Sequence, residues 1–202
     1  MKYPFLASFL VLCAVFYHNN RKADRNREKS KKAYLDRESR ANATRKQPVD
    51  KLDYISVPLD DLPCDVCPDD PVIAECLADL MKLAEEKIVN FTGLTNTDLK
   101  LEYGVANLPF LEKCDLSYTH LIRVLNTWAS RLYEHGFKDK ALIVLEYAVN
   151  IHADISNIYY LAADIYIENG TPEKIDPLIE TAGNLNSVIK NSIIKTLKEK
   201  KG

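Results

Sequence analysis

Residues 122–150 read IRVLNTWASRLYEHGFKDKALIVLEYAVN, and residues 156–184 read SNIYYLAADIYIENGTPEKIDPLIETAGN. The second stretch follows the pattern of the first at an offset of 34 residues, so that Gly136 and Gly170 occupy equivalent positions. Apolar residues recur at spacings of three and four in both stretches, which is typical of amphipathic helices. We therefore predict two helix pairs: Tyr118–Glu134 with Lys138–Asn150, and Asn157–Glu168 with Pro172–Thr181.

The residue types at the matched positions suit closely packed helices. Alanine stands at positions 129, 148, 163 and 182, where a small side chain lets two helices approach each other. Trp128 is expected to fill the space between helices. Gly136 and Gly170 are expected to end the first helix of each pair in a tight turn, because glycine adopts the left-handed backbone conformation at low cost.

This stretch, at about residues 122–189, resembles the tetratricopeptide repeat, whose period is 34 residues. The resemblance implies an all-α fold in which helix-turn-helix units stack into a short right-handed solenoid. The copies depart from the family pattern at three positions: Ala153 and Ser187 replace the usual helix-ending proline, and Ile175 replaces a small residue. We place the helical domain at residues 72–202, with a helix at 72–89 and another around Ile189–Leu197 flanking the repeats.

The resemblance also implies a non-catalytic function, because such modules bind proteins through the concave face lined by the first helix of each pair. The positions carried over are Arg123, Asn126, Ser130 and Tyr133, with Thr127 and Glu134, from the first unit, and Asn157, Tyr160, Asp164 and Glu168, with Leu161 and Ile167, from the second. This mixture of polar and aromatic side chains suits a peptide or helical segment of another protein as the partner. Together with the membrane anchor predicted below, it leads us to expect a membrane-associated partner. An alternative is that a flanking segment of the chain fills the groove.

The N-terminal residues suggest a membrane anchor. Residues 3–17 read YPFLASFLVLCAVFY and carry no charge, although a relaxed membrane-spanning helix needs about 20 apolar residues. We predict a transmembrane signal-anchor at residues 1–20. A cleaved signal peptide is the alternative, but the run lacks an Ala-x-Ala-like cleavage site. Because the basic residues follow the run, the positive-inside rule predicts a single-pass protein of the cytoplasmic membrane with its C-terminal domain in the cytoplasm.

Two segments of different composition follow the apolar run. Residues 21–51 contain twelve Lys and Arg against five Asp and Glu, so we predict a basic juxtamembrane helix or linker at 21–52. We expect its charges mainly to set topology, with attraction to lipid headgroups as a side effect. No aromatic interleaving accompanies them, so no nucleic-acid partner is expected. Residues 53–71 are rich in proline and are predicted to form a linker or a strap against the next module.

A second function is suggested by the cysteines. Cys64 and Cys67 form a C-x-x-C sequence, a spacing found in zinc sites and in thiol–disulfide catalysts. A structural zinc site would need two more ligands, which Cys76 and Cys114 could supply only if the fold brought them together. Zinc binding or thiol redox chemistry at Cys64 and Cys67 is therefore the alternative to a protein-binding scaffold, and the main interpretation includes no cofactor.

No catalytic motif is present in the sequence. The four histidines make no H-E-x-x-H, and the chain contains neither a G-x-S-x-G sequence nor a glycine-rich phosphate loop. With 47% hydrophobic and 28% charged residues, the composition is that of a globular protein. We expect a non-enzymatic protein.

Overall fold

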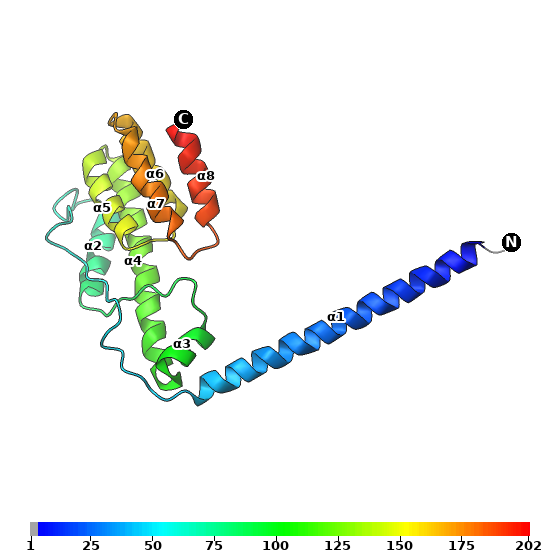
Figure 1. Ribbon diagram of the computed structural model, residues 1–202. Coiled ribbons are helices and arrows are strands. Elements are labelled where there is room, and N and C mark those ends of the chain that lie inside the picture. Colours follow the sequence, from blue (N-terminus) through cyan, green and yellow to red (C-terminus); the bar gives the residue numbers. More distant parts are fainter. Residues whose placement is uncertain (1–3) are drawn as a thin grey trace. The chain divides into compact units, whose positions relative to one another are not determined.

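The computed structural model describes residues 4–202, and in this range the chain is all-helical, as predicted. This range contains eight α-helices, which are labelled in Figure 1. Their bounds, with those of two short 3-10 helices, are α1 Pro4–Ala43, α2 Pro71–Ala84, α3 Asn96–Tyr103, η1 Val105–Asn107, α4 Leu108–Glu134, α5 Lys138–Asn150, α6 Ser156–Glu168, η2 Pro172–Lys174, α7 Ile175–Gly183 and α8 Lys190–Lys201. The described residues form two compact units: unit 1 contains residues 4–47 and 95–108, and unit 2 contains residues 48–94 and 109–202.

Unit 1 is held together by polar contacts between the end of α1 and α3. The Glu38 carboxylate accepts a hydrogen bond from the Thr97 hydroxyl at 2.7 Å and forms an ion pair with Lys100. Gly104 follows α3 with a φ of 83°, and a Cβ atom there would lie 2.5 Å from the carbonyl oxygen of Arg45. This close approach requires glycine at position 104.

The predicted membrane anchor is wrong. No helix within residues 4–202 is both long enough and apolar enough to cross a membrane. The apolar run ends at Tyr17. A stretch of α1 long enough to cross a membrane would therefore include the polar residues His18, Asn19 and Asn20 and then the charged residues from Arg21 onward. The prediction of a single-pass protein of the cytoplasmic membrane is therefore also wrong, and so is the topology that was derived from it. Residues 1–3 of the predicted anchor lie outside the described residues.

In unit 2, the proline-rich segment packs along the helices as a strap. Leu62 is buried, and Ile55, Val57 and Leu59 pack against the core. Ile55 pairs with Ile88 in an isolated antiparallel bridge, and the Tyr147 hydroxyl donates a hydrogen bond to the Ser56 carbonyl at 2.9 Å. The apolar strap residues therefore lie on the helices of the same unit.

The core of unit 2 lies among α2 and α4–α8. Trp128 is fully buried, as predicted from its position. The four alanines at positions 129, 148, 163 and 182 are also fully buried. Helix α6 packs against α5 and α8, and α7 packs beside α8 (Figure 1).

The turns after α4 and α6 have the same hydrogen-bonding pattern. Gly136 and Gly170 have φ angles of 85° and 72°. The residue after each glycine donates its backbone N–H to a carbonyl five residues earlier, Phe137 to Leu132 at 2.9 Å and Thr171 to Tyr166 at 2.8 Å. This is the glycine-terminated helix end expected from the sequence.

Candidate protein-binding surface

A network of amides and a hydroxyl joins α4 to α6. The side-chain amide of Asn157 on α6 donates to the Asn126 Oδ1 atom at 2.9 Å and lies 3.1 Å from the Ser130 Oγ atom, both on α4. Asn126 and Ser130 are half-buried, whereas Asn157 is exposed. Three of the predicted binding residues are therefore together, and they fix each other's orientation.

A second contact between the same helices surrounds Glu168. Its carboxylate accepts a hydrogen bond from the Tyr133 hydroxyl at 2.7 Å and forms an ion pair with Lys138 at 2.7 Å. Hydrogen bonding from Lys138 and then from Tyr133 lowers the pKa of Glu168, and hydrogen bonding to Glu168 raises the pKa of Tyr133. The Lys138 ammonium also lies 5.8 Å from the centre of the Tyr133 ring. Glu168, Tyr133 and Lys138 therefore form a cluster in which the ionised form of the Glu168 carboxyl group is favoured.

The predicted residues Tyr160 and Asp164 face α8. Asp164 forms an ion pair with Lys200, and hydrogen bonding with Thr196 and then Ser192 lowers the pKa of Tyr160. Side chains at positions 192, 196 and 200 lie on one face of α8, because residues four apart are neighbours on a helix. A C-terminal segment of the chain therefore covers this part of the predicted surface.

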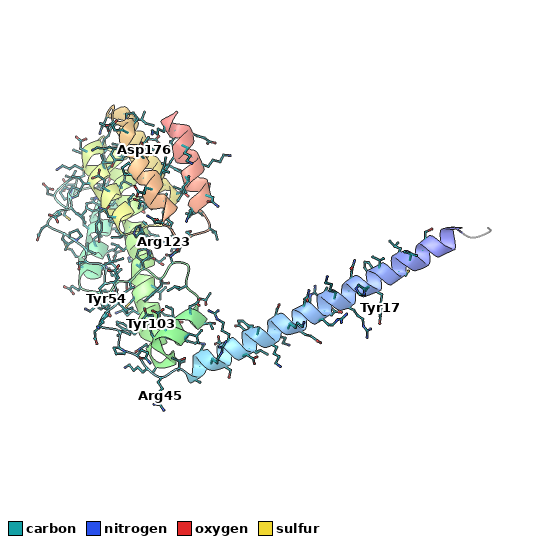
Figure 2. The ribbon with its side chains drawn as sticks, viewed as in Figure 1. Tyr17, Arg45, Tyr54, Tyr103, Arg123 and Asp176 are labelled. Atoms are coloured by element: carbon teal, nitrogen blue, oxygen red, sulfur yellow. The ribbon has the colours of Figure 1, made fainter. Side chains whose placement is uncertain are left out.

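Arg123 lies in a separate cleft between α2 and α4. The cleft has a volume of about 270 Å³ and is lined by Val72, Glu75, Cys76, Asp79, His120, Arg123, Val124 and Thr127. Figure 2 labels Arg123 on α4. The His120 ring pairs with Asp79, their nitrogen and oxygen 3.0 Å apart, whereas Arg123, Glu75 and Thr127 are exposed at the cleft. Arg123 and Thr127 are the predicted residues that line this cleft.

Sequence reasoning did not find the charged residues that complete these contacts. Lys138 and Lys200 each neutralise a predicted carboxylate, and Asp70 binds both Arg131 and His135. One signal for these contacts was present in the sequence. Ser192, Thr196 and Lys200 are spaced four residues apart, which places three polar side chains on one face of a helix. The pairing of Asp70 with Arg131 and His135 could not be found in this way, because both partners are more than 60 residues away along the chain.

The C-x-x-C cysteines are free thiols and half-buried. The Cys64 thiol lies 3.6 Å from the Leu59 carbonyl oxygen, and burial raises its pKa. Burial also raises the pKa of Cys76, to about 11. Among the residues that the structure describes, no group of three or more His, Cys, Asp or Glu side chains could hold a metal ion.

The chain was compared with protein-family models, curated proteins and solved structures, and it shows no significant match to any of them.

Proposed function

We propose that this chain is a non-catalytic protein-interaction module built from tetratricopeptide-like helix pairs, with α4 and α5 as the first pair and α6 and α7 as the second. The equivalent turns after Gly136 and Gly170 support this proposal. So do the four fully buried alanines, one on each of the helices α4, α5, α6 and α7. In such a module the pairs stack as a right-handed solenoid, and α2 and α8 cover its two ends.

The binding surface in this proposal runs along α4 and α6. It includes Arg123, Asn126, Ser130, Tyr133, Asn157 and Glu168. The observation that carries the proposal is that cross-helix hydrogen bonds hold five of these side chains in fixed positions on α4 and α6, and that α4 also lines the cleft that contains Arg123. A surface whose side chains are already ordered loses little conformational entropy when it binds, which favours recognition of a peptide segment.

The cleft indicates what the partner segment contains. Val72, Cys76 and Val124 supply apolar lining, and Arg123 supplies an exposed cation. An acidic side chain on the partner would pair with Arg123 while an apolar neighbour covers the lining. Arginine is well suited to this role, because its planar guanidinium binds a carboxylate through two hydrogen bonds.

Site-specific photocrosslinking tests the proposal. A photoreactive amino acid at Thr127, which lines the cleft, should capture a discrete partner protein in cells that make the chain, whereas the same amino acid at Lys140 on α5 should not. Arg123→Glu should then reduce the capture at least about tenfold, the effect of losing a well-placed charge contact. Lys140→Glu, which changes the charge equally at another exposed position, should leave the capture unchanged. Equal capture from positions 127 and 140, or capture that survives Arg123→Glu, would show that the cleft is not the site.

A further inference from the structure

Helix α8 differs in charge from the rest of unit 2. It contains five lysines and one glutamate. The remainder of unit 2 contains nine Lys and Arg against 22 Asp and Glu. A basic helix therefore lies against a strongly acidic body, and opposite charge favours their association.

The charged contacts between α8 and its neighbours are specific. Lys200 pairs with Asp164 on α6, and Lys201 pairs with Asp176 on α7 at 2.6 Å. Figure 2 labels Asp176 on α7. Thr196 and Ser192 on α8 also lower the pKa of Tyr160 on α6. Two lysines at adjacent positions thus bind two different helices of the acidic body.

Few residues of α8 are buried. Ile193 and Leu197, one helical turn apart, are its only buried residues, and Ile189 and Ile194 are partly buried against the core. Helix α6, of similar length, buries six. The segment before α8, residues 184–189, includes Val188 with 98% of its surface exposed. Helix α8 therefore resembles a bound amphipathic peptide that is held by a few side chains. Counting from Ile193 as i, its apolar residues are at i and i+4 and its basic residues at i+7 and i+8.

We propose that the surface of α6 and α7 beneath α8 is a docking site for a basic amphipathic helix, and that α8 is its resident occupant, which a helix of the same chemistry from a partner protein replaces. The site recognises two branched apolar side chains one turn apart, followed by two lysines or arginines. This inference goes beyond the function proposed for the surface of α4 and α6 and for the α2–α4 cleft. Neither depends on the other, because their residues differ.

Cleavage of the segment between α7 and α8 tests this inference without changing the core. A specific protease site is inserted at Val188 of the full chain, and the folded protein is cut there. We expect the α8 piece to remain bound, since its contacts are intact. A fluorescent peptide of residues 189–202, added in excess, should then replace it, and fluorescence anisotropy reports the exchange.

Two altered peptides separate specific recognition from general attraction. The peptide with Lys200→Glu and Lys201→Glu loses both ion pairs and should bind at least about tenfold more weakly. The peptide with Lys195→Glu and Lys198→Glu has the same net charge, but both of its altered positions are exposed on α8, so it should bind more tightly than the first. Equal weakening of the two peptides would overturn the inference.

Two outcomes with the unaltered peptide would also overturn it. If the peptide never enters the cut protein, α8 is not exchangeable. If release of the α8 piece unfolds the rest of unit 2, as seen by loss of helical circular dichroism, α8 is part of the core and not a ligand. Exchange with the helical signal of α4–α7 retained supports the inference.

Discussion

At the scale of single residues, Asp70 connects three parts of unit 2 through one carboxylate. Its Oδ1 atom accepts hydrogen bonds from the backbone N–H groups of Val72 and Ile73 at the start of α2, at 2.9 and 3.1 Å. Its Oδ2 atom lies 2.8 Å from an Arg131 nitrogen and 2.9 Å from the His135 ring. The ionised form of Asp70 therefore caps α2 and joins it to the end of α4 and the turn that follows.

The pH dependence of stability should reflect this carboxylate. Hydrogen bonding from Arg131 and then from His135 holds the pKa of Asp70 well below its usual range. A carboxyl group with a depressed pKa in the folded state stabilises the protein above its unfolded pKa, about 3.9, and this contribution is lost as the pH falls further. We expect Asp70→Asn to lower the urea midpoint at pH 6, and the difference from wild type to shrink as the pH is lowered toward about 2.

A neighbouring carboxylate provides the control. Asp69 is exposed, so Asp69→Asn should leave both the midpoint and its pH dependence close to those of wild type. Asparagine can still cap a helix, so Asp70→Asn chiefly tests the pairing with Arg131 and His135. A constant difference between Asp70→Asn and wild type from pH 6 to about pH 2 would contradict this account.

At the scale of elements, the helices with a strong apolar period could be predicted from the sequence. Helix α5 has the predicted bounds, and α6 begins one residue earlier than predicted. Helix α2 begins at Pro71, one residue before the predicted start, and Asp70 followed by Pro71 is a local signal for a helix N-terminus. These signals come from residues that are close together in the chain, so they can be recognised from the sequence alone.

Element boundaries set by distant contacts could not be predicted. Helix α2 ends at Ala84 and not at Val89, because Ile88 is buried in a non-helical segment that pairs with Ile55. Helix α4 begins at Leu108, ten residues before the predicted start, since a proline near the first turn is compatible with a helix. The same limit applies to the candidate surface: the residues of α4 and α6 could be named, but their pairing with Lys138 and α8 depends on the fold.

The two glycine turns should respond alike to substitution. Gly136 and Gly170 have positive φ angles, and an added Cβ atom would meet nothing within 4 Å at either position. Replacement by alanine therefore costs only the left-handed backbone conformation, about 1–2 kcal/mol. We expect Gly136→Ala and Gly170→Ala to lower the free energy of unfolding by this amount, measured by urea denaturation.

Helix α7 contains a glycine that serves as the control. Gly183 has open space around it and no positive φ, so Gly183→Ala should be neutral or stabilising by up to about 1 kcal/mol. If the costs at positions 136 and 170 differ by more than about 1 kcal/mol, the two turns are not energetically equivalent, and the proposed repeat loses a main support.

At the scale of the whole molecule, burial differs sharply between the two units. Among the unit 1 residues whose side chains are described, only Ala41, Thr97, Leu99, Gly104 and Asn107 are buried. Unit 2 has a hydrophobic core that includes Trp128, Tyr118 and Tyr159, all fully or almost fully buried. Since buried apolar surface is the main source of stability, the units are expected to open at different free energies.

Hydrogen exchange should resolve this difference. We expect the backbone amides of α3, in unit 1, to exchange through a low-energy local opening, while those of α6, in unit 2, exchange only on global unfolding. Glu38→Ala removes the contacts with Thr97 and Lys100 that hold α3 to α1, so it should accelerate exchange in α3 and leave α6 unchanged. Glu28→Ala removes the same charge from an exposed position of α1 and should change neither helix. If α3 and α6 exchange at the same rate in the wild-type protein, or if Glu38→Ala accelerates both equally, the chain opens as one cooperative body and the division into two units has no energetic counterpart.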